Sequence, residues 1–339
     1  MDLERDGPTV LETPPGTLGV FNDAWGGYLQ DIGFFGPDQG KGGKYLVLPP
    51  DYQSEIPDGY FVVPSKTYRV LSYIRAFIAE GLEAVTQYIK DQLRIYPLCQ
   101  KDNPPEMEFI SGSGKSFNTI FPNDYTFYEH LHRVIDGEHI GILDPETRGF
   151  FASIGIEKGK PFAPDDRMKQ ILTDAIKIAN ATARSIVWFP RTKGTMQGIQ
   201  IYPDTDSAWQ MLYVDKNVFF NGQDGQTMNY DAWAMFYYPY VGVTPAQAVG
   251  LPGRGSDYAI AYIDSEKNPF DGSKTYQLHL PPDPPVENFW DLTLYDNQTR
   301  SMLQTSQAFP TVGSQTEGLQ KNDDGSYDIY FGPDPPRRV

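Results

Sequence analysis

Cysteine is almost absent from this chain, since Cys99 is the only one among 339 residues. A single cysteine cannot form an intramolecular disulfide, and it cannot supply the several thiolates that a cysteine-based zinc site requires. A disulfide-stabilised domain and a domain built around a cysteine-based zinc site are therefore both excluded. The fold must depend on buried apolar surface, which a chain of this length with 40% hydrophobic residues can supply.

Long hydrophobic runs are missing as well. No stretch approaches the roughly eighteen consecutive apolar residues of a membrane-spanning helix. The first residues, Met1–Asp6, lack the basic and apolar regions of a signal peptide. We therefore expect a soluble chain without a membrane partner, and the sequence leaves its compartment open.

Positive charge is in short supply. Lysine and arginine number 28 against 44 aspartates and glutamates, which gives a formal net charge of −16. Such a chain repels a phosphate backbone, and no basic stripe with interleaved aromatic residues is present. Nucleic acid is therefore excluded as the expected partner.

Three familiar catalytic or binding motifs are incomplete. The Gly-Lys-Ser at 114–116 ends like a phosphate-binding loop, but the glycine required five residues earlier is replaced by Phe109. His130 and His132 are two apart on a predicted helix, so they point in nearly opposite directions and cannot share a metal ion. No Gly-x-Ser-x-Gly segment is present. We expect no metal and no cofactor.

Glycine, proline and aromatic residues are abundant, with 32 Gly, 29 Pro, 22 Tyr and 20 Phe. This composition is typical of many short strands joined by tight turns. Apolar and polar residues alternate over 276–280, four prolines break the chain between 281 and 285, and an aromatic strand is predicted at 289–296. We predict a mainly β fold of two antiparallel, jelly-roll-like β-sandwich domains with a few peripheral α-helices.

The stretch from Tyr276 to Arg300 also carries a family resemblance. Tyr-Gln-Leu-His-Leu-Pro, then Pro-Val-Glu-Asn-Phe-Trp-Asp-Leu-Thr-Leu-Tyr-Asp, and later Asn-Asp-Asp-Gly-Ser at 322–326 resemble domain of unknown function 1214. Upstream, Gly-Lys-Pro-Phe at 159–162 and Arg-Gly-Ser-Asp-Tyr at 254–258 are similar to the usual arrangement, in which domain of unknown function 1254 precedes it. The resemblance implies two jelly-roll-like sandwiches and no established activity.

The domain organisation follows from the same reading. Residues 1–16 are polar and punctuated by proline, so we expect a flexible arm. An N-terminal β-sandwich domain should occupy 17–186, and a C-terminal jelly-roll domain 187–339. Within the first domain, apolar residues at steps of three and four predict helices near 66–95, 124–135 and 165–185.

Arg75 lies on the apolar face of the helix predicted at 66–95. A charge in that position requires a carboxylate or a ligand to meet it. An internal ion pair and a ligand-facing role are both open.

The remaining candidates lie at predicted strand ends and in one aromatic segment. Arginines and aspartates at the rim of a β-sandwich can hold a polar ligand, and aromatic side chains can stack on a flat one. Each also has a plain structural explanation: the aspartates close turns, Arg191 and Arg300 pair with them, and the tyrosines fill a seam between domains. The candidates are Arg191, Trp233, Tyr237, Tyr238, Arg254, Asp264, Trp290, Asp296 and Arg300.

Our first hypothesis is a cleft between the domains that binds a polar, partly flat ligand such as a glycan. Arg75, Arg191 and Arg254 would hold its oxygens, while Trp233, Tyr237 and Trp290 would stack on it. If chemistry occurs, Asp264 and Asp296 would serve as acid and base of a metal-independent hydrolase. The alternatives are a non-enzymatic homo-oligomer built through jelly-roll faces and, as a minor one, a lyase or isomerase acting on a small molecule.

Overall fold

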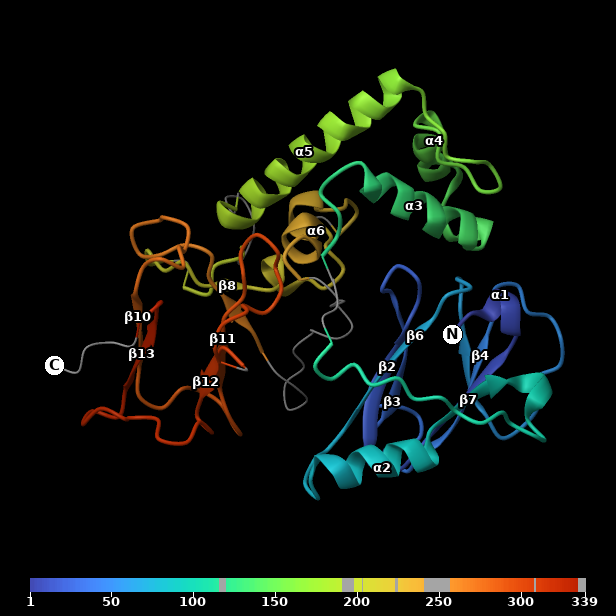
Figure 1. Cartoon of the computed structure of the whole chain (residues 1–339), viewed down its shortest axis with the longest axis horizontal. Helices are drawn as coiled ribbons and strands as arrows, with labels where there is room; N and C mark the ends of the chain where they lie inside the picture. The colour runs from blue at the N-terminus through green and yellow to red at the C-terminus, as the bar shows by residue number, and fades with distance from the viewer. Residues whose placement is uncertain are drawn as a thin grey trace. The chain divides into compact units, whose positions relative to one another are not determined.

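The computed structural model describes residues 1–115, 120–190, 198–202, 204–222, 225–240, 257–307 and 309–334 (Figure 1). These residues form two compact units. Unit 1 contains the described residues up to Ala181 except Ile120, together with Asp257. Unit 2 contains Ile120, the described residues from Thr182 to 240 and those from Tyr258 onward. The division falls between Ala181 and Thr182, inside a helix, rather than after residue 186 as predicted.

Among its described residues, unit 1 contains seven strands and five α-helices, of which the last continues into unit 2. In chain order the elements are α1 (Leu3–Asp6), β1 (Thr9–Thr13), β2 (Thr17–Asn22), β3 (Tyr28–Gly33), β4 (Gly43–Leu48), β5 (Phe61–Pro64), β6 (Leu71–Ala76), α2 (Leu82–Gln92), β7 (Arg94–Pro97), α3 (Thr126–Gly137), α4 (Pro145–Ser153) and α5 (Asp166–Trp188).

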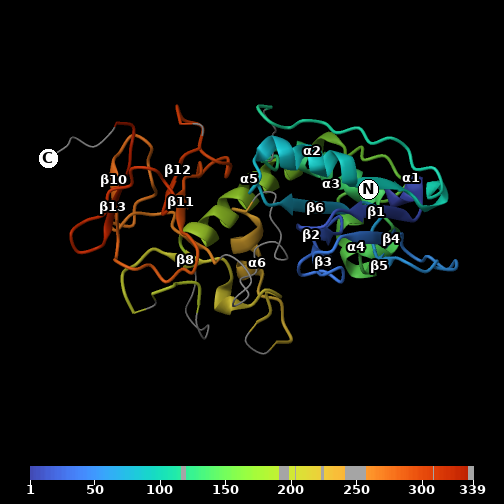
Figure 2. The ribbon, with the colours of Figure 1, turned by 90° about the horizontal axis from the view of Figure 1, so that it is seen from below.

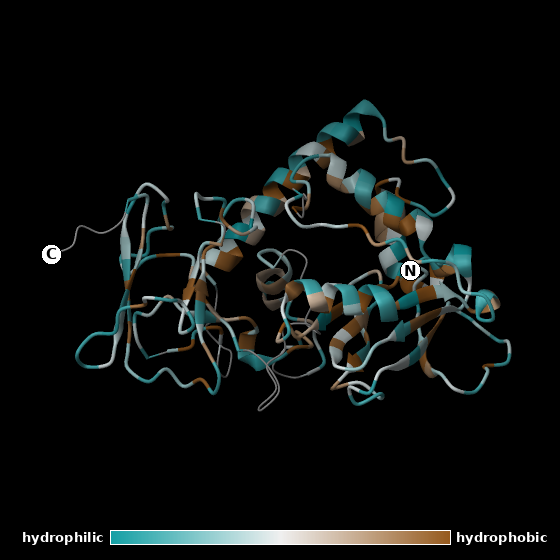
Figure 3. Cartoon of the chain, turned by 60° about the horizontal axis from the view of Figure 1, so that its bottom comes forward, coloured by the Kyte–Doolittle hydropathy of each residue, from teal (hydrophilic) through white to brown (hydrophobic). Residues whose placement is uncertain are grey.

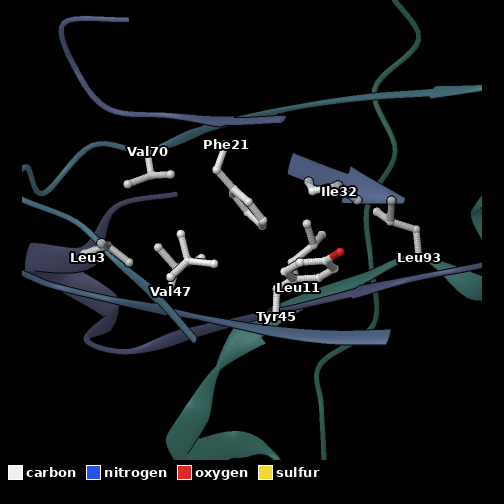
Figure 4. Packing of buried hydrophobic residues seen from close by; sticks show 9 residues of the cluster. Leu3, Leu11, Phe21, Ile32, Tyr45, Val47, Val70 and Leu93 are labelled. Carbon is white, nitrogen blue, oxygen red and sulfur yellow. The ribbon is translucent and has the colours of Figure 1, made fainter. Parts of the chain in front are cut away.

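The described strands of unit 1 form two sheets, in the orders β5-β4-β1-β7 and β3-β2-β6. Figure 2 labels β1 to β6. All neighbours are antiparallel except β4 and β5. Leu11 and Tyr45 from the first sheet and Phe21 and Ile32 from the second are fully buried in one cluster (Figure 4). The two sheets therefore enclose a common core.

The first sheet is buried on both faces. Val10, Leu46 and Tyr96 belong to a second apolar cluster, separate from the one that contains Leu11. Val10 and Leu11 are neighbours in β1, and successive side chains of a strand point to opposite faces. The loop residue Tyr52 packs against the second cluster and helps to cover the outer face.

The prediction of a flexible arm at 1–16 is wrong. Val10 and Leu11 are fully buried, and β1 lies in the interior of its sheet, paired with β4 on one side and β7 on the other. Prolines and charged residues surround this strand in the sequence and give the segment the composition of a flexible arm. The short apolar pair was sufficient for a central strand because it supplies one buried side chain to each face.

The helix predicted at 66–95 is correct only in its second half. Residues 71–76 form β6, in which exposed and half-buried side chains alternate, and the helix α2 begins after Gly81. Arg75 is therefore not on a buried helix face: it is exposed, pairs with Leu18 across the sheet, and lies 5.7 Å from the ring centroid of Tyr73. Its exposure removes the need for a buried partner.

The other two predicted helices are present. They correspond to α3 and to α5, in which hydrophobic and hydrophilic residues form alternating bands (Figure 3). The helix α5 runs three residues beyond the predicted end and takes in Val187 and Trp188. Helix α4 was not predicted.

Unit 2 contains a helix and six short strands among its described residues: β8 (Gln210–Met211), α6 (Tyr230–Tyr237), β9 (Ala259–Ile260), β10 (Tyr276–Leu280), β11 (Asp291–Thr293), β12 (Thr311–Gly313) and β13 (Tyr327–Phe331). The strands pair antiparallel as β8 with β9, β10 with β13, and β11 with β12. The predicted strand at 276–280 is confirmed as β10. Strands in several small sheets are thus established, whereas their jelly-roll order stays a prediction.

The core of unit 2 surrounds α6. Phe236 is fully buried, and its ring stacks at 5.2 Å on Tyr213 and lies 5.7 Å from that of Phe220. Met235 and Ala232 face the same interior. This packing fixes the helix, and with it the aromatic segment that follows.

Glu138 ties the end of α3 to the start of β6. Its side chain is 1% exposed, and its two carboxylate oxygens accept hydrogen bonds from the backbone N–H groups of Tyr68 at 2.6 Å and Arg69 at 3.0 Å. Burial raises the pKa of this carboxyl group, and the two hydrogen bonds oppose the increase only in part.

The raised pKa of Glu138 predicts a pH-dependent stability of unit 1. The folded state holds the proton to higher pH than the unfolded chain, so this contribution is complete below the unfolded pKa of about 4.5 and is lost as pH rises through the folded pKa. We expect Glu138→Gln to lower stability at neutral pH by about 1–3 kcal/mol, because one N–H would then face an amide NH₂ group. It should also flatten the dependence above pH 4.5.

Hydrogen exchange of peptides covering 60–76, measured from pH 4 to 7, checks this prediction. The exposed Glu83 in α2 provides the control, since Glu83→Gln should leave the profile of those peptides unchanged. A Glu138→Gln profile parallel to that of the unmodified chain would contradict it.

Candidate functional site

Arg300 lies in a turn that follows β11. The chain reverses between Tyr295 and Met302, where Asp296 N–H donates to Ser301 O at 2.9 Å and Arg300 N–H donates to Asp296 O at 2.8 Å. Arg300 itself has φ of 63°, a left-handed conformation that non-glycine residues rarely adopt. The turn therefore holds Arg300 in a specific, mildly strained position.

Asp296 stabilises this turn. Its Oδ1 accepts hydrogen bonds from the backbone N–H groups of Thr299 at 2.6 Å and Gln298 at 2.9 Å. The bond from Thr299 holds the pKa of Asp296 below its usual range, against the opposing effect of partial burial. The carboxylate is thus kept ionised, as in the turn-closing explanation above.

The guanidinium of Arg300 is anchored to the end of α6. Its Nη1 donates to the backbone oxygen of Tyr238 at 3.0 Å, and its Cζ lies 4.5 Å from the centroid of the Tyr238 ring. A cation over an aromatic face in this range contributes about 0.5–2 kcal/mol. Two of the predicted ligand-binding residues, 62 positions apart, are therefore brought into contact.

Two nitrogens of the Arg300 guanidinium lack a hydrogen-bond partner in the part of the chain that the structure describes. Among the described residues, its Nε and Nη2 are buried and make no hydrogen bond. Burial lowers the pKa of the Arg300 guanidinium, and the positive charge of Arg184 lowers it further while Tyr238 opposes this effect. A buried charged donor that is left unsatisfied costs about 1–3 kcal/mol or more. The site is thus a half-buried cation with unused hydrogen-bonding capacity.

Asp264 closes a neighbouring hairpin. Ile263 bridges to Pro269, and Asp264 Oδ1 accepts from the N–H groups of Glu266 and Asn268, both at 2.9 Å. The side chain of Asn297 donates to Phe270 O at 3.2 Å, which links this hairpin to the Arg300 turn. Both predicted catalytic aspartates are therefore engaged with backbone donors, and their catalytic role stays a prediction.

Trp233 and Tyr237 lie together on another side of α6. Four residues apart on the helix, their rings are 5.9 Å apart, and Tyr230 stacks on Trp233 at 6.1 Å. Trp233 is 40% exposed. Because Tyr238 is five residues beyond Trp233, it points away from this pair and toward Arg300 instead. The predicted aromatic cluster is thus divided into two parts.

The remaining predicted residues do not join the Arg300 site through any described contact. Trp290 lies edge-on to Tyr327, with ring centroids 5.2 Å apart. Arg75 belongs to unit 1. Arg191 and Arg254 lie outside the described residues.

Arg184 was missed from the sequence although a signal was present. On α5 it precedes Trp188 by four residues, and its Cζ lies 5.5 Å from the Trp188 ring centroid. Spacing of four between arginine and tryptophan on a predicted helix indicates a cation–π pair. The effect of its charge on the pKa of Arg300 could not be predicted from the sequence, because the two residues are far apart along the chain.

His132 takes a structural role in unit 1. Its Nε2 lies 2.8 Å from the carbonyl oxygen of Lys160, and its ring stacks on Phe162 at 5.7 Å. These contacts fasten the loop before α5 to α3. His132 and Phe162 also line a surface hollow of about 370 Å³ together with Glu129 and Arg133.

In comparison with known proteins, each end of the chain matches a family model. Residues 1–97 match the model of a protein of unknown function called DUF1254, and residues 255–339 match that of a protein of unknown function called DUF1214. The crystal structure of the VPA0106 protein from Vibrio parahaemolyticus is similar with a TM-score of 0.49 and 19% identity, over 96% of this chain and 74% of that one. No curated protein matches. In the described residues, no helix is long and apolar enough to cross a membrane.

Proposed function

The chain belongs to the family that joins a DUF1254 region to a DUF1214 region, and because neither description assigns an activity, we propose its function from the Arg300 site. We propose that unit 2 binds a small polar, partly flat ligand at Arg300. The ligand accepts one hydrogen bond from each of the two Arg300 nitrogens that have no partner among the described residues.

The observation that carries this proposal is the pair of buried, unpartnered nitrogens on Arg300. Buried polar groups are hydrogen-bonded in the great majority of native structures, so an unpartnered pair requires an explanation, and a functional role is one. The arginine is also held in place before any ligand arrives, by Tyr238 on one side and by a left-handed backbone on the other. Such preorganisation reduces the entropy lost on binding.

The geometry supports binding more than hydrolysis. Acid/base cleavage of a glycan uses one carboxyl group with a raised pKa and a second that is ionised. The pKa of Asp296 is lowered, and Oδ1 of both Asp264 and Asp296 accepts hydrogen bonds from backbone N–H groups. We therefore propose the binding role without the hydrolase activity.

Loss of Arg300 is expected to abolish ligand capture. Unmodified protein incubated with a metabolite extract should retain a small molecule detectable by mass spectrometry after rapid desalting, and Arg300→Gln should retain none of it. Lys321→Gln is the matched control, because Lys321 lies 5.8 Å from the ring centroid of Tyr327 and is also a cation over a tyrosine. Equal retention by the Arg300→Gln variant and the unmodified chain would refute the proposal.

A second candidate function is assembly through α6. Tyr230 and Trp233 are 70% and 40% exposed and stack on each other, and the nearby Phe219 is 74% exposed. Exposed aromatic clusters of this kind are frequent in protein interfaces. Light scattering after size exclusion separates the candidates: an oligomer that Trp233→Ser dissociates, and that Phe289→Ser leaves intact, supports assembly.

For the fold, we propose that the small sheets of each unit belong to jelly-roll-like sandwiches. Support comes from unit 1, where two sheets enclose one core.

A further inference from the structure

We infer that the ligand of the Arg300 site carries a carboxylate, and this inference rests on the proposed binding function. The inference is based on the identity of the guanidinium nitrogens that make no hydrogen bond among the described residues. A hydroxyl, a phosphate and a carboxylate differ in the number of oxygens and in the charge that they present to a guanidinium.

The two unpartnered nitrogens form one edge of the planar guanidinium. Nε–H and one N–H of Nη2 point in parallel from that edge, whereas Nη1 occupies the opposite corner and donates to Tyr238 O at 3.0 Å. A carboxylate presents two oxygens at the spacing of these parallel donors and accepts both. The protein thus uses the third nitrogen as an anchor and leaves the bidentate edge without a hydrogen-bond partner among the described residues.

A neutral hydroxyl matches this edge poorly. It offers a single oxygen, and it does not compensate the charge of a half-buried guanidinium that already feels the positive charge of Arg184. Charge-assisted bidentate hydrogen bonds are about twice as strong as neutral ones. A carboxylate therefore gains both the geometry and the charge balance.

A phosphate matches the surroundings poorly. Phosphate sites collect several backbone N–H donors, commonly from a helix N-terminus or a concave loop. Here the N–H groups of Gln298 and Thr299 already donate to Asp296, and that of Arg300 donates to Asp296 O. Among the described residues of the turn, these three N–H groups are engaged and the guanidinium edge remains, which suits a monoanion with two oxygens.

The test is calorimetric titration with four probes: acetate, benzoate, inorganic phosphate and glucose. Unmodified protein should bind acetate or benzoate, and Arg300→Gln should bind neither. Arg300→Lys retains the positive charge but removes the fork, so it should weaken carboxylate binding by at least about tenfold. Lys321→Gln should bind as the unmodified chain does. Circular dichroism of each variant confirms that the chain is folded.

The outcomes separate the inference from the proposed function. Binding of glucose or phosphate that depends on Arg300, without binding of either carboxylate, overturns the inference and leaves the binding function intact. Capture from the metabolite extract of a ligand that lacks a carboxyl group does the same. Carboxylate binding that Arg300→Lys preserves in full overturns the bidentate assignment. If neither the probes nor the extract yields binding that depends on Arg300, both proposals are wrong.

Discussion

Replacing Asp38 by alanine is expected to destabilise unit 1 by about 4 kcal/mol. Asp38 is 4% exposed and accepts three hydrogen bonds, from Gly33 N–H at 2.7 Å, Gly42 N–H at 3.1 Å and the Tyr45 hydroxyl at 2.6 Å. Removing the carboxylate would leave these three donors unsatisfied. It would also release the loop between β3 and β4.

The Tyr45 hydroxyl should lose most in this variant. Burial and the bond to Asp38 raise the pKa of Tyr45, and its ring is fully buried between Phe21 and Phe61. The hydroxyl therefore has no route to water without disrupting the core. We expect Asp38→Asn, which keeps one acceptor oxygen, to lose about half as much stability.

Urea unfolding followed by hydrogen exchange in β1 to β4 measures this effect within unit 1. The exposed Asp102 is the control, since Asp102→Ala should not shift the midpoint. A loss below roughly 1 kcal/mol for Asp38→Ala would show that water or a rearranged loop replaces the carboxylate.

The second large effect is expected from Gly33→Ala, at about 3–5 kcal/mol. Gly33 has φ of 79°, and a Cβ atom there would lie 1.8 Å from the carbonyl oxygen of Thr17 and 2.8 Å from the Cα of Leu18. These are backbone atoms of β2, so no side-chain rotation relieves the clash. The end of the β2–β3 ladder, where Leu18 pairs with Gly33, would have to separate.

Gly16→Ala provides a matched control for this prediction. Gly16 has a similar φ of 76° in the same unit, but a Cβ atom there would meet nothing within 4 Å. Its substitution should cost only the left-handed backbone penalty of about 1–2 kcal/mol. Equal destabilisation by the two variants, measured by urea unfolding, would mean that the β2–β3 contact gives way freely.

Period-two patterns were the most reliable part of the sequence. The alternation over Tyr276 to Leu280 predicted both ends of β10, because this strand pairs with β13 alone among the described strands and keeps the polar Gln277 and His279 exposed. The same rule would have found β6, where Leu71, Tyr73 and Arg75 share one face. There the leucines and isoleucines also fitted a helical period, and the shorter repeat was overlooked.

The site could be predicted only in parts. Arg300, Tyr238 and Asp296 were each identified from residue type and position, as was the turn-closing role of aspartate. Their assembly was not, because Tyr238 and Arg300 are 62 residues apart and meet through a backbone carbonyl, which no side-chain pattern encodes. The structural explanation offered for Arg300, an ion pair with an aspartate, does not occur among the described residues.

The interior position of β1 has a consequence for how this protein can misassemble. Since β1 bonds to β4 through five residue pairs and to β7 through four, its departure would leave a vacant slot flanked by two open ladders. The same strand of another molecule fits that slot as well as its own does. Conditions that loosen residues 9–13 should therefore promote strand exchange between copies before the chain unfolds completely.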